Sequence, residues 1–285
     1  MDIAPELEGG AGAAAGAAPA RGWRARLELG FERRGAATVL AHQRHEGPLV
    51  VQRPFYPEGP VCHVYVLHPP GGVVAGDELQ VQLAVGPQAQ ALVTTPAAGK
   101  FYRSAGPTAR LRQDLDVTGG TLEWLPQENI YYPGALAVQA TQVRLSGAAR
   151  FLGWEIACLG LAARGAPFEQ GLVRQQLELQ LDGRWLLCER QRLDAPMCAA
   201  RWGLAGGDSV GTLLAYPADA ALLEQARAVQ VEGVTLAATL VEGLLVCRAI
   251  AAGADRLRAA FVAVWCALRP GWAGRAAQAP RVWAT

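Results

Sequence analysis

The strongest constraint in this sequence is an alternation of apolar and polar residues that recurs between residues 23 and 215. Residues 23–29 read WRARLEL and residues 78–85 read ELQVQLAV, with apolar side chains at every second position. Successive side chains of a β-strand point to opposite faces, so this period indicates strands that bury one face. Glycine, proline and aspartate separate these segments, as is typical of turns. The pattern predicts a β-rich fold without the strand–helix rhythm of parallel α/β proteins.

Two dipeptides predict tight reversals between strands. Asp182-Gly183 lies between the segments QLELQL and RWLLCE, and Glu242-Gly243 lies between VTLAATLV and LLVCRAI. Glycine adopts the positive φ angle of a type I′ hairpin turn without steric cost. We therefore expect a β-hairpin at each place.

Two late segments have the period of amphipathic helices. Pro217 is expected to begin the first, whose apolar stripe is Leu222, Leu223, Ala226 and Val229. In the second, apolar residues recur at i, i+3 and i+4 spacing: Leu257, Ala260, Phe261, Val264, Trp265 and Leu268. Asp255 lies near the expected start of this helix, and Arg269-Pro270 is expected to end it.

The chain divides into a short N-terminal segment and one folded unit. Residues 1–21 are rich in glycine, alanine and proline, offer little to pack, and are predicted to be disordered. Residues 22–285 contain neither an internal repeat nor a linker. We expect a mainly β, many-stranded, β-helix-like single domain with two helices near the C-terminus.

Charge and hydropathy exclude several classes of function. The net charge is +1, and no basic block suggests a nucleic-acid partner. The longest apolar run, near residues 259–268, is far shorter than the roughly 20 residues that a bilayer requires. The N-terminus lacks the basic and apolar regions of a signal peptide. We expect a cytoplasmic protein that binds neither nucleic acid nor a membrane.

The cysteines are expected to be buried thiols. No C-x-x-C motif is present, and most of the cysteines lie in apolar runs, where they act as small hydrophobic residues. They are Cys62, Cys158, Cys188, Cys198, Cys247 and Cys266.

Four histidines, which lie close together in the sequence, raise the alternative of a metal hydrolase. His42 and His45 are three residues apart, and His63 and His68 are five apart, so each pair would face opposite ways on a regular strand. A hydrolase site needs metal ligands that converge. Structural or surface roles are therefore favoured, with Cys62 and His63 kept as candidate contacts of a passing metal ion.

Motifs for nucleophilic or phosphate chemistry are not found. The sequence has no G-x-S-x-G string, and residues 69–77 (PPGGVVAGD) lack the Gly-Lys-Ser/Thr of a P-loop. The glycines there suit a tight reversal of the chain. We expect no enzymatic activity.

Three carboxylates lie in unusual places. Asp77 follows the Gly-Gly loop, Glu155 interrupts the apolar run FLGWEIACLG, and Glu189 lies on the apolar side of an alternating strand. A carboxylate inside apolar β-structure costs several kcal/mol unless it is paired, hydrated or bound to a cation. A turn role is favoured for Asp77. For Glu155 and Glu189, an ion pair with an arginine such as Arg164 or Arg190 and a hydrated interior remain open.

Several strings between Trp23 and Thr285 together are specific enough to indicate a family. They include residues 45–59 (HEGPLVVQRPFYPEG), 62–72 (CHVYVLHPPGG), 100–104 (KFYRS) and 122–128 (LEWLPQE). These strings resemble the UreD (UreH) family of urease accessory proteins. The residues that carry the resemblance are Gly47, Pro48, Gln52, Arg53, Pro54, Tyr56, His68, Pro69, Pro70, Gly71, Gly72, Lys100, Arg103, Trp124, Pro126 and Gln127.

The resemblance implies a β-rich maturation scaffold with a pair of helices and no known enzymatic activity. Such proteins bind UreF, which recruits the GTPase UreG, and bind apo-urease, so a hetero-oligomeric complex is expected. A water-filled passage through the protein has been proposed to carry nickel. By motif matching, Asp77, Glu155 and Glu189 fall at positions associated with that passage.

The chemistry of these carboxylates suits transient Ni²⁺ rather than a tightly bound cofactor. Thiolate and imidazole clusters bind Ni²⁺ tightly, whereas scattered carboxylates with water release it more readily. An adaptor that holds UreF on urease and conducts nothing is the alternative that the sequence leaves open.

Overall fold

The computed structural model describes residues 22–161 and 164–284, so the predicted disorder of residues 1–21 lies outside the described residues.

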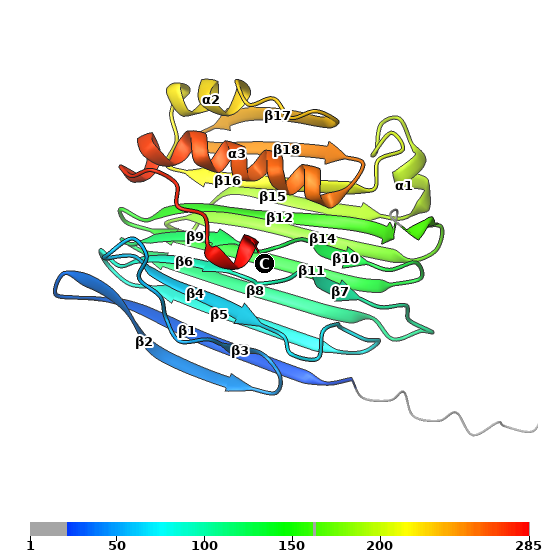
Figure 1. The fold of residues 1–285 in the computed structure, drawn as a ribbon, viewed down its shortest axis with the longest axis horizontal. Coiled ribbons are helices and arrows are strands. Elements are labelled where there is room, and N and C mark those ends of the chain that lie inside the picture. The colour runs from blue at the N-terminus through cyan, green and yellow to red at the C-terminus, as the bar shows by residue number, and fades with distance from the viewer. Residues whose placement is uncertain (1–21, 162–163, 285) are drawn as a thin grey trace, which may run out of the picture.

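Most of the described chain forms two β-sheets (Figure 1). The first sheet has, in spatial order, β15 (Arg184–Leu193), β14 (Leu172–Leu181), β11 (Leu136–Ser146), β8 (Ala109–Thr118), β5 (Glu78–Val85), β1 (Arg24–Arg34) and β2 (Ala37–Glu46). The main path of the second has β17 (Val234–Val241), β18 (Leu244–Ala251), β16 (Ser209–Tyr216), β12 (Arg150–Leu161), β9 (Thr121–Leu125), β6 (Gln90–Thr94), β4 (Cys62–Leu67) and β3 (Val50–Val51). Three short strands join the second sheet: β10 (Asn129–Tyr131) and β13 (Ala166–Pro167) pair with β12, and β7 (Gly99–Phe101) pairs with β10.

The middle of the chain coils between the two sheets. From β4 to β14, successive long strands alternate between them, and each pairs in parallel with the next strand of its own sheet, as in β5–β8–β11–β14 and β4–β6–β9–β12. Antiparallel hairpins β1–β2, β14–β15 and β17–β18 flank this coil. The mainly β single domain expected from the sequence is confirmed.

The two predicted hairpin turns are present. Asp182 and Gly183 have φ angles of +48° and +79°, and Glu242 and Gly243 have +49° and +79°. Both central residues of each turn are therefore left-handed, as a type I′ turn requires.

One apolar core lies between the sheets and a second lies under the helices. The inward residues of β1, which are Ala25, Leu27, Leu29 and Phe31, belong to the first core. The outer face of the second sheet is covered by α2 (Ala220–Arg227) and α3 (Ala254–Ala273) (Figure 1). Phe261 of α3 packs there against Trp154, and Trp265 belongs to the same core. Strand β12 is consequently buried on both faces, which explains its continuous apolar run.

The helix boundaries differ from the expected ones. Helix α2 begins at Ala220, not Pro217, because Asp219 caps it by accepting a hydrogen bond from Leu222 N at 2.9 Å. Helix α3 continues through Pro270 and ends before Gly274, whose φ of +68° suits a helix C-terminus. Proline near a helix end removes one hydrogen bond, and the buried side chains of Arg269 and Trp272 hold the last turn in place.

Two short elements were not expected from the sequence. Helix α1 (Ala195–Ala199) is capped by Asp194, and a 3₁₀ turn, η2 (Arg281–Ala284), lies near the C-terminus. None of the helices in the described chain has the length and apolarity that a bilayer-crossing helix requires.

Candidate functional site

The side chain of Glu155 points into the space between the sheets because alternate residues of β12 face opposite sides. Phe151 and Ala157, on the same face of β12, belong to the core between the sheets, whereas Trp154 and Ile156 pack under the helices. Glu155 shares the parity of the first pair, so the carboxyl group faces the first sheet. It is 9% exposed. No arginine pairs with it among the described residues, and Arg164 is exposed.

A cavity of about 260 Å³ extends from Glu155 between the sheets. Half of the residues that carry the family resemblance line this cavity: His68, Pro69, Gly71, Gly72, Lys100, Trp124, Pro126 and Gln127. The buried Trp124 Nε1 has no hydrogen-bond partner among residues 22–161 and 164–284. Most of the cavity lining is apolar, and the volume is large enough for water where the few polar side chains supply hydrogen-bond partners.

A second, smaller hollow adjoins the first at Glu155. Its lining includes Glu155, Gln175, Glu189, Gln191 and Thr212. The carboxyl group of Glu155 thus borders both hollows, and Glu155 and Glu189 face each other from opposite sheets. Among the described residues, Glu155 is the lining residue that the two hollows share: the first reaches the loop around Gly72, and the second reaches strand β15.

Glu189 is ion-paired at the outer side of this hollow. Arg248 Nη2 of β18 donates to Glu189 Oε2 at 2.5 Å, and Gln191 Nε2 donates to Glu189 Oε1. The arginine partner suggested by the sequence, Arg190, instead pairs with Glu178 at 3.2 Å. Glu189 therefore has a charged partner that Glu155 lacks.

The surroundings of Glu155 favour its neutral form. Burial raises the pKa of Glu155 to about 7, and the charge of Glu189 acts in the same direction. Hydrogen bonds with Thr141 and Gln139 act in the opposite direction. The Thr141 hydroxyl also lies 2.6 Å from Gln113 Oε1, so a small polar cluster surrounds the carboxyl group. Near neutral pH this carboxyl group is poised between its two protonation states.

Asp77 is buried in a turn and lines neither hollow. Its Oδ1 accepts a hydrogen bond from Trp23 N at 2.8 Å, and its Oδ2 accepts one from Val74 N at 2.9 Å. This is the turn role that the sequence favoured. Its charge still acts on His68, which lines the first cavity: burial lowers the pKa of His68, and the charge of Asp77 opposes that effect.

The other family-motif residues lie outside the cavity. Gly47 forms the turn after β2 with a φ of +71°, and the remaining ones lie in loops: Pro48, Gln52, Arg53, Pro54, Tyr56, Pro70 and Arg103. Among these, Gln52, Arg53, Tyr56, Pro70 and Arg103 are exposed.

Cys62 and His63 point to opposite faces of β4. Cys62 lies in the core between the sheets, where burial raises the pKa of its thiol and disfavours the metal-binding thiolate. His63 Nε2 lies 2.8 Å from Glu58 Oε1 on the outer face. In the described part of the chain, no three His, Cys, Asp or Glu side chains are grouped so that they could hold a metal ion. The hydrolase alternative therefore has no converging ligand set among these residues.

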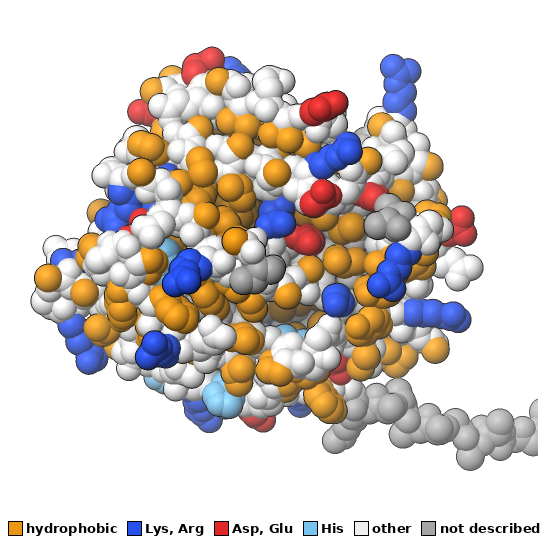
Figure 2. Space-filling model, in the orientation of Figure 1, with side chains coloured by type: hydrophobic (Ala, Val, Ile, Leu, Met, Phe, Trp, Pro, Cys, Tyr) orange, Lys and Arg blue, Asp and Glu red, His pale blue; other side chains and the backbone are white. Residues whose placement is uncertain are grey.

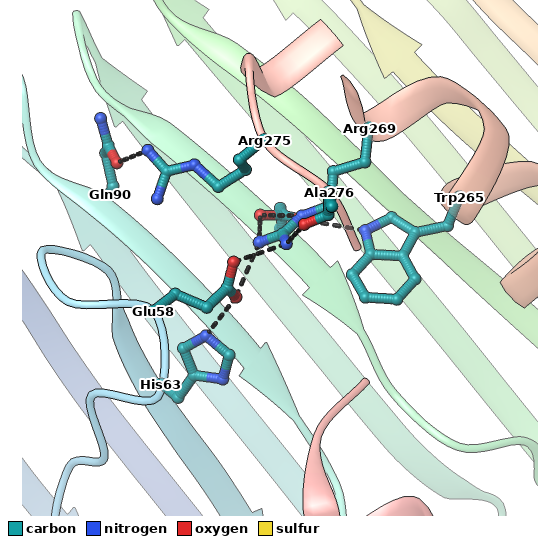
Figure 3. A network of polar contacts seen from close by, with 8 residues as sticks. Glu58, His63, Gln90, Trp265, Arg269, Arg275 and Ala276 are labelled. Atoms are coloured by element: carbon teal, nitrogen blue, oxygen red, sulfur yellow. Dashed lines mark hydrogen bonds and ion pairs between the residues drawn. The ribbon is translucent and has the colours of Figure 1, made fainter. Parts of the chain in front are cut away.

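A buried ionic network around Arg269 was missed at the sequence level. The Arg269 guanidinium, which is fully buried, donates to Glu58 at 2.6 and 2.8 Å, to Glu123 at 2.9 and 3.0 Å, and to Ala276 O at 2.7 Å (Figure 3). Trp265 Nε1 also donates to Glu123, at 2.6 Å. Arg269 lies four residues after Trp265, on the apolar stripe of α3, and this position was the available signal of burial.

The polar residues opposite Glu155 were also missed. Gln113, Gln139, Thr141 and Gln175 occupy inward positions on β8, β11 and β14, in segments whose other inward residues are mostly apolar. A polar residue at an inward position of an alternating strand is the signal that could have found them.

Comparison with known proteins identifies the family. Residues 23–284 match the model of the UreD urease accessory protein family. Three similar relatives, each named urease accessory protein UreD, come from Azoarcus sp. strain BH72 (48% identical, over 93% of this chain and 95% of the relative), Pseudomonas putida strain F1 (46%, 93% and 95%) and Aliivibrio fischeri strain ES114 (41%, 93% and 97%). The chain therefore belongs to the UreD family of urease accessory proteins.

Proposed function

We propose that this urease accessory protein is a non-catalytic scaffold that binds UreF, and through it UreG, together with apo-urease, and that assists nickel delivery through the two adjoining hollows. Ni²⁺ is a transient cargo in this proposal. The observation that carries it is the position of the Glu155 carboxyl group, which borders both hollows without an arginine partner among the described residues.

The chemistry of the lining supports passage rather than storage. Carboxylate and amide oxygens of Glu155, Glu189 and Gln139 are weaker ligands for Ni²⁺ than thiolate or imidazole groups, and His68 is the single imidazole among the described residues that line the two hollows. An ionised Glu155 lowers the cost of a divalent cation in the interior, and protonation removes that attraction. Asp77 acts in this proposal by holding the loop beside the first cavity and by its charge near His68.

Exposed apolar side chains support the binding of partner proteins. Apolar atoms are spread among scattered charges over the face shown in Figure 2. The large hydrophobic residues that are exposed in the described chain are Trp23, Tyr56, Val74, Tyr102, Trp185, Trp202 and Val241. Partners that cover such residues remove apolar area from water.

Urease activation in cells that carry the urease genes tests this proposal. Glu155→Gln and Glu189→Gln are expected to lower urease activity while pull-downs still recover UreF and apo-urease. Glu178→Gln is the matched control, because Glu178 is a buried carboxylate on β14 that borders neither hollow. Full activity in both passage variants would leave the purely structural adaptor as the function.

A further inference from the structure

A third cavity lies on the other side of the second sheet. It has a volume of about 390 Å³ and lies between the starts of β6, β9 and β12 and the C-terminal end of α3. Its polar side chains are Gln90, Thr121, Glu123, Arg150 and Arg275. None of these residues borders the hollows around Glu155.

Arg150 has no carboxylate partner in this cavity. Its guanidinium lies over the ring of Trp272, 5.1 Å from the centroid, and makes no hydrogen bond or ion pair with any residue that the structure describes. Burial lowers the pKa of Arg150, and no neighbouring charge opposes this effect. The aromatic ring orients the guanidinium while all of its N–H donors stay free.

Arg275 is likewise held by a neutral group. Its Nη2 donates to Gln90 Oε1 at 2.6 Å, and Figure 3 shows this pair beside the Arg269 network. An amide oxygen orients the guanidinium without neutralising it. Arg269 differs, because two carboxylates and a carbonyl oxygen accept from all three of its nitrogens.

The one carboxylate among the described lining residues, Glu123, already has a cationic partner. Arg269 donates to both oxygens of Glu123, and Trp265 donates to Oε2. Counting the ionised lining side chains, Arg150 and Arg275 contribute +2 and Glu123 contributes −1, so the cavity keeps a net charge of +1. A positive, partly enclosed cavity with free N–H donors attracts an anion.

We propose that this cavity binds a single oxyanion, a carboxylate or phosphate group, between Arg150 and Arg275. The Thr121 hydroxyl supplies a further donor on the cavity wall. Guanidinium groups bind carboxylate and phosphate through paired N–H donors, which fits two arginines whose donors are free. The group is either a free anion or an acidic side chain of a bound protein.

Titration of inorganic phosphate and of acetate into the purified full-length protein tests the site. At constant ionic strength, with chloride as the reference anion, we expect a saturable rise in the unfolding midpoint. Arg150→Gln and Arg275→Gln should each weaken binding about tenfold or more, and the double variant should lose it. Arg201→Gln, at an exposed arginine outside the cavity, is the matched control. Equal midpoints of the variants without anion would show that they fold.

A second experiment, a capture assay with the partner proteins, identifies the source of the oxyanion. Apo-urease and UreF are captured with the wild-type protein and with the double variant, with and without phosphate. Loss of a partner in the double variant, together with competition by phosphate, assigns the site to an acidic side chain of that partner. Unchanged capture with lost phosphate binding assigns it to a free anion. The proposal is overturned if the double variant captures both partners as the wild type does and phosphate does not bind. It is also overturned if capture is unchanged and phosphate binds the wild type and the double variant equally, which would show an adventitious ion only.

Discussion

Glu155 of β12 and Glu189 of β15 border the same hollow from opposite sheets, and the charge of Glu189 adds to the burial that raises the pKa of Glu155 to about 7. A pair of carboxylates in one small space is stabilised by sharing a proton or a cation. Arg248 already supplies a counter-charge to Glu189, so the uncompensated position is Glu155.

Replacement of Glu155 with glutamine should stabilise the protein in a pH-dependent way. The pKa of this carboxyl group rises from 4.5 to about 7 on folding, so the folded state holds the proton more tightly. The resulting stability is full below about pH 4.5 and is lost as the pH rises through 7. At pH 8, Glu155→Gln should therefore raise the free energy of unfolding by on the order of 2–3 kcal/mol. Urea unfolding at pH 5 and pH 8 measures this; an equal effect at both values would contradict it.

Removal of the Thr141 hydroxyl should shift the titration of Glu155. This hydroxyl favours the ionised carboxylate, so Thr141→Val is expected to raise the pKa of Glu155 above about 7. Carbon NMR of labelled glutamate measures the shift directly. Nickel transfer by the assembled complex should then require a higher pH. Thr239→Val, at an exposed threonine of β17, is the control. An unchanged Glu155 titration in Thr141→Val would show that the hydrogen bond does not act in solution.

The Arg269 network should be a major contributor to stability. Arg269→Met leaves Glu58 and Glu123 buried without their cation, which typically costs about 3–5 kcal/mol. Chemical unfolding measures the loss, and Arg201→Met should cost little because that side chain is exposed. Addition of Glu58→Gln and Glu123→Gln to Arg269→Met should recover part of the stability. A loss below about 1 kcal/mol in Arg269→Met would contradict this account.

The same network predicts acid sensitivity. Burial raises the pKa of Glu58, but hydrogen bonds from His63 and Arg269 outweigh that effect and lower it from 4.5 to about 2. A depressed carboxyl pKa contributes stability above about pH 4.5 that is lost as the pH falls toward 2. Glu58→Gln should therefore flatten the stability profile in this window, measured by unfolding at several pH values. A profile as steep as that of the wild type would exclude Glu58 as a cause.

Two glycines with similar φ angles provide a matched test of the loop after β2. Gly47 and Gly59 have φ of +71° and +69°, but a Cβ atom on Gly47 would collide with the carbonyl oxygen of Arg24, whereas one on Gly59 would meet open space. Gly59→Ala should cost about 1 kcal/mol from backbone strain alone. Gly47→Ala should cost at least about 2 kcal/mol, because the steric clash is added. Thermal unfolding compares the two, and equal costs would contradict the clash.

Local patterns in the sequence predicted much of the fold but not the pairing of its strands. The period of two and the Asp182-Gly183 turn depend on nearby residues only. The parallel pairing of β1 with β5 depends on partners about fifty residues apart, which the period of a single strand does not specify. The end of α3 was wrong because a local rule for Pro270 yields to tertiary packing around Arg269.

The candidate site was predicted only in part. Glu155 could be found because a carboxylate in an apolar run is costly, and its position between the hollows follows from strand parity. The ion pairs of Arg269 could not be predicted, because 211 residues separate it from Glu58 and 146 residues separate it from Glu123. The Arg248 partner of Glu189 was missed for the same reason, at a separation of 59 residues.

The nickel content of urease at limiting nickel tests the central claim most directly. Purified complexes of apo-urease with UreF, UreG and this protein would be loaded with Ni²⁺ below saturation, and the metal bound to urease would be measured after the accessory proteins are removed. We predict that Glu155→Gln lowers the nickel loaded per urease several-fold, while Glu178→Gln loads as the wild type does and both complexes keep their composition. Equal loading by Glu155→Gln and the wild type would contradict a passage past Glu155.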